Sequence, residues 1–135
     1  MQETEYLAHR LAKKFLEWDE PIPDFNSRFP NILESTLAVP FQTFGKRSLY
    51  PMLYDKAAIL FYLLIKNHPF QNGNKRVAVT SLFVFLHVNG YWMRLQADQL
   101  YRIAVWVAES EPEFKDGVIL ALKNFIKKNM VLLDE

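Results

Sequence analysis

The chain has 135 residues, of which 50% are hydrophobic and 15% aromatic, so it can bury a sizeable core. Its 16 lysines and arginines nearly balance 15 aspartates and glutamates, and a net charge of +1 supplies no basic field for direct nucleic-acid binding. The absence of cysteine excludes disulfides and thiolate zinc sites. We expect residues 1–135 to form a single domain.

The first five residues, Met1-Gln2-Glu3-Thr4-Glu5, are acidic, whereas a secretory signal begins with basic residues and continues with apolar ones. The longest apolar run, 57–65, is much shorter than the roughly 20 residues that a membrane-spanning helix needs. We therefore expect a cytoplasmic protein without a membrane partner.

Hydrophobic residues at three- and four-residue spacing predict a first amphipathic helix over 3–17. A short second helix is expected over 31–38, with Asn31 as its N-cap and Pro40 beyond its end.

The segment 41–51 resembles a loop or short flap. Gly45 permits a turn there, and Lys46 and Arg47 add charge. From the residues alone, these two cations could simply be exposed surface groups.

Two strongly apolar stretches predict the centre of the fold. The helices expected over 52–66 and 74–89 are apolar on nearly every side, so they should be buried, and Gly90 suits the left-handed end of the second. Beyond them we expect an extended segment and two more helices, over 91–95, 98–109 and 114–128. The fold class is therefore all-α, a bundle with a central buried helix hairpin and a short flap.

A polar block joins the two apolar helices: His68-Pro69-Phe70-Gln71-Asn72-Gly73-Asn74-Lys75-Arg76. A helix that begins at Gly73-Asn74 leaves its first backbone N–H groups without partners, and its dipole favours negative charge there. Gly73 permits close approach of a ligand, Asn74 adds a donor, and Lys75 and Arg76 add cations. The block predicts a site for a phosphoanion.

His68 lies directly before this anion site. A neutral imidazole, with an unperturbed pKa of about 6.5, can take a proton from an incoming hydroxyl. A histidine at a helix end is otherwise often a capping residue, but its place beside an anion site favours catalysis. The arrangement suits group transfer from a nucleotide.

The block resembles the signature of the Fic/Doc (death-on-curing) family, His-x-Phe-x-Asp/Glu-Gly-Asn-Gly/Lys-Arg. The resemblance extends over most of the chain and includes Leu33-Glu34-Ser35, Tyr50-Pro51, Lys56-Ala57-Ala58 and Asn89-Gly90-Tyr91. It implies the Fic/Doc helical bundle.

The resemblance also implies roles for residues of the block. His68 would be the catalytic base, and Phe70 would anchor the loop in the core. Nucleotide phosphates would be held by Gly73, Asn74, Lys75 and Arg76, and the flap would align the target through Lys46 and Arg47.

Two positions favour the Doc branch of the family. Lys75 stands where most members have glycine, and Val79 replaces a second arginine. By resemblance, this branch transfers the γ-phosphate of ATP to elongation factor Tu, halts translation, and is paired with a Phd-like antitoxin. Transfer of AMP, the commoner reaction of the family, is the alternative.

Asn72 departs from the family pattern, which has at this position a carboxylate that ligates Mg²⁺. An amide oxygen can ligate Mg²⁺, but it contributes no charge, so the affinity for the metal should be lower. A slow kinase, a kinase whose metal is held mainly by substrate phosphates, and a catalytically silent binding module all remain open.

Overall fold

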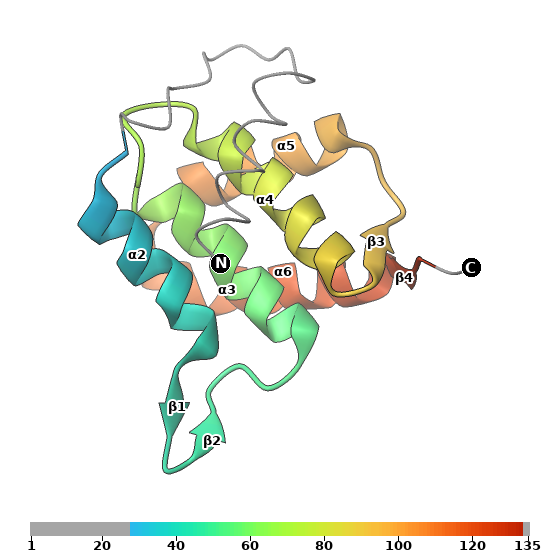
Figure 1. Ribbon diagram of the computed structural model, residues 1–135. Helices are drawn as coiled ribbons and strands as arrows, with labels where there is room; N and C mark the ends of the chain where they lie inside the picture. Colours follow the sequence, from blue (N-terminus) through green and yellow to red (C-terminus); the bar gives the residue numbers. More distant parts are fainter. Residues whose placement is uncertain (1–27, 134–135) are drawn as a thin grey trace.

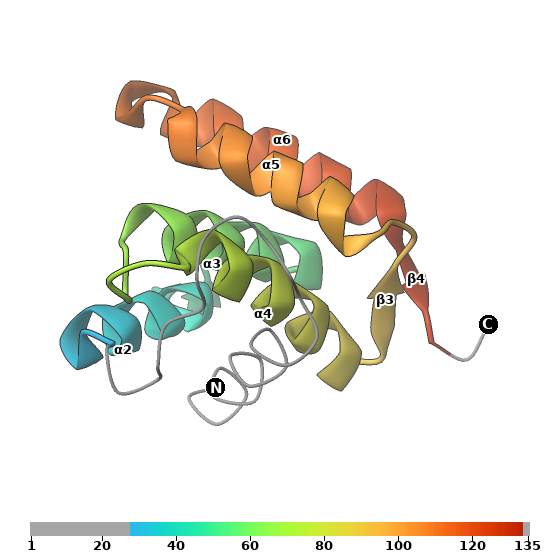
Figure 2. The same ribbon diagram turned by 90° about the horizontal axis from the view of Figure 1, so that it is seen from above.

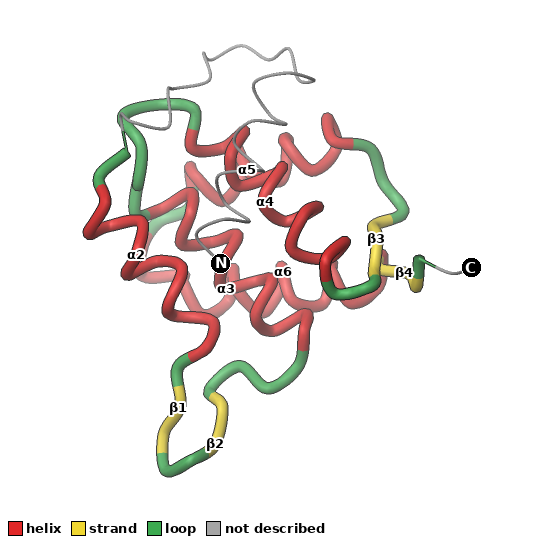
Figure 3. The backbone as a smooth tube through the Cα atoms, viewed as in Figure 1, coloured by secondary structure: helices red, strands yellow, loops and turns green. Residues whose placement is uncertain are grey.

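The computed structural model describes residues 28–133 (Figure 1), so the helix predicted over 3–17 lies outside the described residues. This part of the chain is mostly helical, as the predicted all-α class requires, with two small antiparallel strand pairs (Figure 3). Its elements in chain order are α2 (Pro30–Ala38), the 3₁₀ helix η2 (Val39–Phe41), β1 (Thr43–Phe44), β2 (Arg47–Ser48), α3 (Leu53–Lys66), α4 (Asn74–Val88), β3 (Tyr91–Met93), α5 (Ala97–Glu109), the 3₁₀ helix η3 (Pro112–Phe114), α6 (Lys115–Asn129) and β4 (Met130–Leu132).

The predicted central hairpin is formed by α3 and α4, which pack against each other. Every residue from Ala57 to Ile65 is buried, with at most 8% of its surface exposed. α6 packs on α3 and α5 packs on α4, so both outer helices cover the same side of the hairpin, while α2 lies on the other side (Figure 2). Burial from two sides explains why α3 has no polar face.

Local hydrogen bonds define the start of α3 and the end of α4. The carboxylate of Asp55 accepts a hydrogen bond of 3.1 Å from the Met52 N–H, which satisfies one of the unpaired groups at the start of α3. At the end of α4, Gly90 has a φ of +86° and donates its N–H to the His87 carbonyl at 3.0 Å. The bounds predicted for these two helices are confirmed to within one residue.

The start predicted for the second helix is wrong. Phe29 is the N-cap of α2, and Pro30 occupies its first turn, so Asn31 lies inside the helix and makes no capping bond. Proline fits the first helical position because its missing N–H would have no partner there.

The flap is a β-hairpin, in which Thr43 pairs with Ser48 and Phe44 with Arg47. Positive φ values at Gly45 (57°) and Lys46 (67°) are those of a type I′ turn, whose twist matches that of paired strands. The sequence indicated a turn here but not the strands that it joins.

A second strand pair closes the other end of the chain. β3 lies within the predicted extended segment 91–95, and its antiparallel partner β4 was not predicted. Three residues directly after a helix carry too weak a pattern to reveal a strand whose partner is distant in the sequence.

Two lysines connect α3 to neighbouring segments. The Lys56 ammonium donates to the Tyr50 carbonyl and, at 3.3 Å, to Ser48 Oγ, so it ties the flap to the start of α3. The Lys66 ammonium donates to the Ser110 carbonyl and holds the end of α5 at the other end of the helix. Between residues 28 and 133, no helix is both long and apolar enough to cross a bilayer.

Candidate active site

The polar block forms a loop at one end of the hairpin, between the last turn of α3 and the first turn of α4 (Figure 1). The Asn67 N–H still bonds the Leu63 carbonyl at 2.9 Å, and His68 then turns the chain with a φ of +49°. A side chain in this left-handed region costs roughly 1–2 kcal/mol, which is why glycine usually follows a helix. His68 is therefore held in a strained conformation, and its side chain is exposed.

The amide of Asn74 clamps the loop from inside. Asn74 Oδ1 accepts a bond of 3.0 Å from the Phe70 N–H, and Nδ2 donates one of 2.9 Å to the Phe70 carbonyl. Asn74 is 6% exposed, and the ring of Phe70 is fully buried in the core. The backbone of the loop is thus fixed both by packing and by two buried hydrogen bonds. The phosphate-binding role expected of the Asn74 side chain stays a prediction, because both of its amide atoms hold the loop in this conformation.

The same amide contacts the His68 ring. Because its two bonds to Phe70 fix which atom is the nitrogen, Asn74 Nδ2 faces His68 Nδ1, at 3.4 Å. An amide nitrogen can only donate, so Nδ1 acts as the acceptor, and the neutral ring carries its hydrogen on Nε2. The contact is longer than an ordinary hydrogen bond, and the lone pair of Nδ1 is engaged only weakly.

Helix α2 supports the loop from the side. The Phe29 N–H donates to the Pro69 carbonyl at 2.7 Å, and Asn67 Nδ2 donates to Thr36 Oγ1 at 3.1 Å. Thr36 is completely buried. Sequence reasoning missed this supporting role, because only the packing of α2 brings Thr36 within reach of the loop.

The start of α4 faces the same loop. Gly73 is its N-cap, with a φ of +72°, and the first bond within the helix runs from the Val77 N–H to the Gly73 carbonyl, at 3.0 Å. The preceding N–H groups have no partner inside the helix, and the first turn contains no acidic residue to offset its positive potential. Lys75 is partly exposed and Arg76 is 4% exposed. Backbone donors and two basic residues thus occur together in the first turn of the helix that follows His68, a combination that suits an anion site.

The residues of this loop fit a magnesium ion poorly. Mg²⁺ is usually bound through one or two carboxylates together with substrate phosphates. Residues 28–133 contain no cluster of three histidine, aspartate or glutamate side chains that could hold a metal. Asn72 is exposed and offers one uncharged oxygen. The protein itself therefore supplies little of what would hold this ion.

The flap residues Lys46 and Arg47 do not meet the loop. Both are exposed at the tip of the hairpin, which projects from the opposite end of α3 (Figure 1). The 14 residues of α3 span roughly 21 Å. A ligand that touches both regions must therefore be extended, as a segment of a protein target would be.

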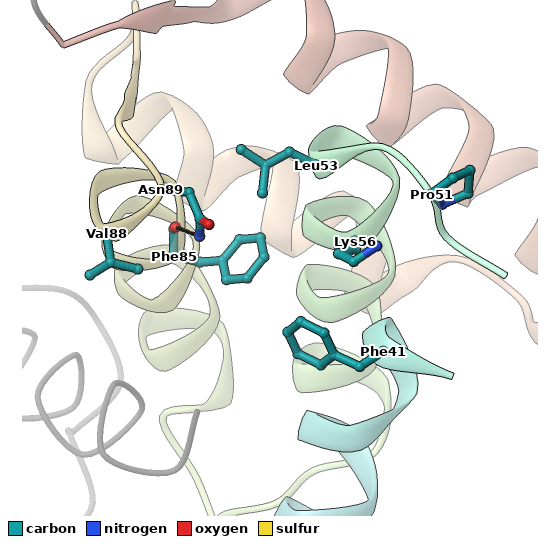
Figure 4. Close-up of a pocket in the computed structure, with 7 residues that line it drawn as sticks. All are labelled: Phe41, Pro51, Leu53, Lys56, Phe85, Val88 and Asn89. Carbon is teal, nitrogen blue, oxygen red and sulfur yellow. Dashed lines mark hydrogen bonds between the residues drawn. The ribbon is translucent and has the colours of Figure 1, made fainter. Parts of the chain in front are cut away.

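A cavity of about 420 Å³ lies at the flap end of the hairpin (Figure 4). Apolar side chains dominate its wall, which is formed by Phe41, Pro51, Leu53, Lys56, Phe85, Val88 and Asn89. None of the residues expected to perform chemistry lines it, so its size alone does not mark the active site.

Comparison with known proteins identifies the family of the chain. A model of the Fic/DOC family matches residues 3–86, more than half of the chain. The chain therefore belongs to the Fic/DOC family.

Among curated relatives, Toxin Doc of Mycolicibacterium smegmatis is 42% identical over 67 residues. The match covers 50% of the chain and 50% of the relative, so the chain spans about half the length of that protein. No solved structure gave a significant match.

Proposed function

We propose that this protein is a Doc-like toxin that transfers the γ-phosphate of ATP to a hydroxyl of a protein target. The observation that carries the proposal is the placement of His68, which is exposed and lies 3.4 Å from the Asn74 amide at the start of α4. Membership of the Fic/DOC family and the likeness to a protein named Toxin Doc support it.

In the proposed reaction, the exposed imidazole of His68 takes the proton of the target hydroxyl. The hydroxyl oxygen forms a bond to the γ-phosphorus as the bond to the bridging oxygen breaks, and ADP leaves. The N–H groups at the start of α4, with Lys75 and Arg76, bind the phosphate oxygens and stabilise the charge that gathers on them.

Magnesium would neutralise part of the charge on the phosphates when it is bound with ATP. Because Asn72 contributes only a neutral oxygen, the ion would depend mainly on the nucleotide for its ligands. This feature favours a second candidate, a binding module whose catalytic activity has been weakened or lost.

By family resemblance, we propose elongation factor Tu as the target, inhibition of translation as the effect, and a Phd-like antitoxin as the controlling partner. Lys46 and Arg47 would contact the target, since they are exposed and lie apart from the nucleotide loop. The place of action would be the cytoplasm, where this target is found.

The decisive experiment measures the intact mass of purified elongation factor Tu after incubation with the protein, ATP and Mg²⁺. A phosphate-sized gain that His68→Ala abolishes is the expected result. An AMP-sized gain would instead identify an adenylylating enzyme.

Asn72→Asp separates a weakened enzyme from a silent module. We expect this variant to modify the target faster by roughly tenfold or more, because a carboxylate raises the charge that holds the metal. Absence of modification by both proteins, with ATP binding retained, would favour the silent module.

A further inference from the structure

The chain contains two Asn-Gly pairs, Asn72-Gly73 and Asn89-Gly90, and α4 places one at each of its ends. An asparagine followed by glycine is chemically labile, since no side chain on the glycine hinders attack of its backbone nitrogen on the asparagine side-chain carbonyl. The two pairs share this intrinsic reactivity, so any difference between them must come from the fold.

Hydrogen bonds protect the second pair. Asn89 Nδ2 donates to the Phe85 carbonyl at 2.7 Å (Figure 4), and the Gly90 N–H donates to the His87 carbonyl at 3.0 Å. Both the attacked amide and the attacking nitrogen must therefore be released before they can react.

The first pair lacks this protection. Asn72 is exposed, and within residues 28–133 neither its side-chain amide nor the Gly73 N–H makes a hydrogen bond. The attacked side-chain amide is thus exposed and the attacking nitrogen has no hydrogen bond to break within this range, although Gly73 itself is buried.

The electrostatic environments of the two pairs also differ. Attack by the backbone nitrogen requires loss of its proton, and negative charge then moves onto the former carbonyl oxygen. The start of α4 and the neighbouring Lys75 stabilise negative charge at Asn72-Gly73, whereas the opposite end of the helix dipole disfavours it at Asn89-Gly90.

We propose that Asn72 is a site of spontaneous deamidation. The Gly73 nitrogen loses its proton and bonds to Cγ of Asn72, the bond from Cγ to the amide nitrogen breaks as that nitrogen takes up a proton, and ammonia leaves a cyclic succinimide. Water then opens the ring. Cleavage of the bond between Cγ and the Gly73 nitrogen gives aspartate, and cleavage at the main-chain carbonyl gives isoaspartate.

The functional consequence rests on the proposed function. Aspartate at position 72 places a carboxylate at the loop position where the family resemblance expects a magnesium ligand. The newly made protein would thus hold Mg²⁺ weakly, and ageing would convert a fraction of it into a form that binds the ion more tightly. The isoaspartate product lengthens the backbone before Gly73 and should not produce this gain.

Peptide mapping by mass spectrometry tests the chemistry without any assay of activity. The purified full-length protein is aged at neutral pH, digested under mildly acidic conditions, and scored for loss of the amide at each asparagine. We expect Asn72 to react at least about tenfold faster than Asn89, which corresponds to roughly 1.4 kcal/mol in the barrier.

A parallel sample aged in concentrated urea shows whether the fold causes the difference. There the two pairs should react at similar rates, because their hydrogen bonds and the helix dipole are gone. Equal rates in the folded protein, faster reaction at Asn89, or an intact Asn72 after ageing would overturn the proposal.

Titration of Mg²⁺ into the protein with a non-hydrolysable ATP analogue tests the consequence. Asn72→Asp should bind the ion roughly tenfold more tightly than the unaged protein, and the matched control Asn89→Asp should not differ from it. Superimposable titrations of all three proteins would refute the metal-binding consequence, independently of whether elongation factor Tu is modified.

Discussion

At the loop end of the α3–α4 hairpin, Phe70, Asn74 and Arg76 are 0%, 6% and 4% exposed, whereas at the flap end Phe44 is 81% exposed. Buried side chains hold the loop that carries His68, and two paired residues on each strand hold the flap. Group transfer needs reacting atoms in a defined geometry, which packing provides. Recognition of a protein segment needs an accessible surface, which the flap provides. One hairpin therefore separates a rigid chemical end from an exposed end suited to a partner.

The largest expected difference is in the loss of stability when each of two phenylalanines is replaced by alanine. Phe70→Ala should lower the free energy of unfolding by about 3–5 kcal/mol, because it empties a fully buried site, while Phe44→Ala should change it by less than about 0.5 kcal/mol. Urea unfolding followed by circular dichroism measures both. Equal effects of the two substitutions would show that side-chain packing stabilises the two ends of the hairpin to the same extent.

A second difference concerns the amide that clamps the loop. Asn74→Ala removes two hydrogen bonds to the buried backbone of Phe70 and should destabilise the fold by about 2–4 kcal/mol. Asn89→Ala removes a single bond at the partly buried end of α4 and should cost about 1 kcal/mol. Similar decreases in the urea midpoint of the two variants would mean that the Asn74 hydrogen bonds contribute no more to stability than the single Asn89 bond.

Each end of the α3–α4 hairpin contains a residue with a strained backbone. His68 and Lys46 are the non-glycine residues with positive φ among those that the structure describes, one in each region. Relative to alanine at the same position, glycine should stabilise the protein by about 1 kcal/mol in both cases.

Activity should distinguish the two strained positions. His68→Gly should gain stability over His68→Ala, yet both should lack transfer activity, since neither has a base. Thermal unfolding and the mass assay together check this expectation. A less stable His68→Gly would indicate that the loop can relax without strain.

The smallest expected effect lies in the middle of α3, which links the two ends. Burial, with a smaller contribution from the charge of Asp116, raises the pKa of the Tyr62 phenol above its ordinary value of 10.0. The folded protein keeps this proton at a pH where the unfolded chain has lost it. Tyr62 thus stabilises the fold below the unfolded pKa, and this contribution falls as the pH rises through the folded pKa.

Tyr62→Phe removes the titrating group and should make stability less dependent on pH between about pH 9 and pH 11. Urea midpoints measured across this range for both proteins check the expectation. Identical slopes would show that Tyr62 does not contribute to alkaline unfolding.

Predictions from sequence were most accurate where one local pattern sufficed. Unbroken apolar stretches indicated α3 and α4, and Gly90 marked the end of α4. They failed where a local rule met a competing one, as when Pro30 rather than Asn31 set the start of α2. They were silent on β4, because a strand of three residues depends on a distant partner.

The sequence by itself determined the helix hairpin, the position of the polar loop and the chemical groups in it. Hydrophobic periodicity and the order of residues between two apolar helices contain that information. Only the tertiary structure decided that the Asn74 amide faces inward, that Thr36 supports the loop, and that the flap lies at the far end of α3. It also decided which of two identical Asn-Gly pairs is protected. These features depend on hydrogen bonds and burial that arise when distant segments pack together, so a local sequence pattern does not encode them.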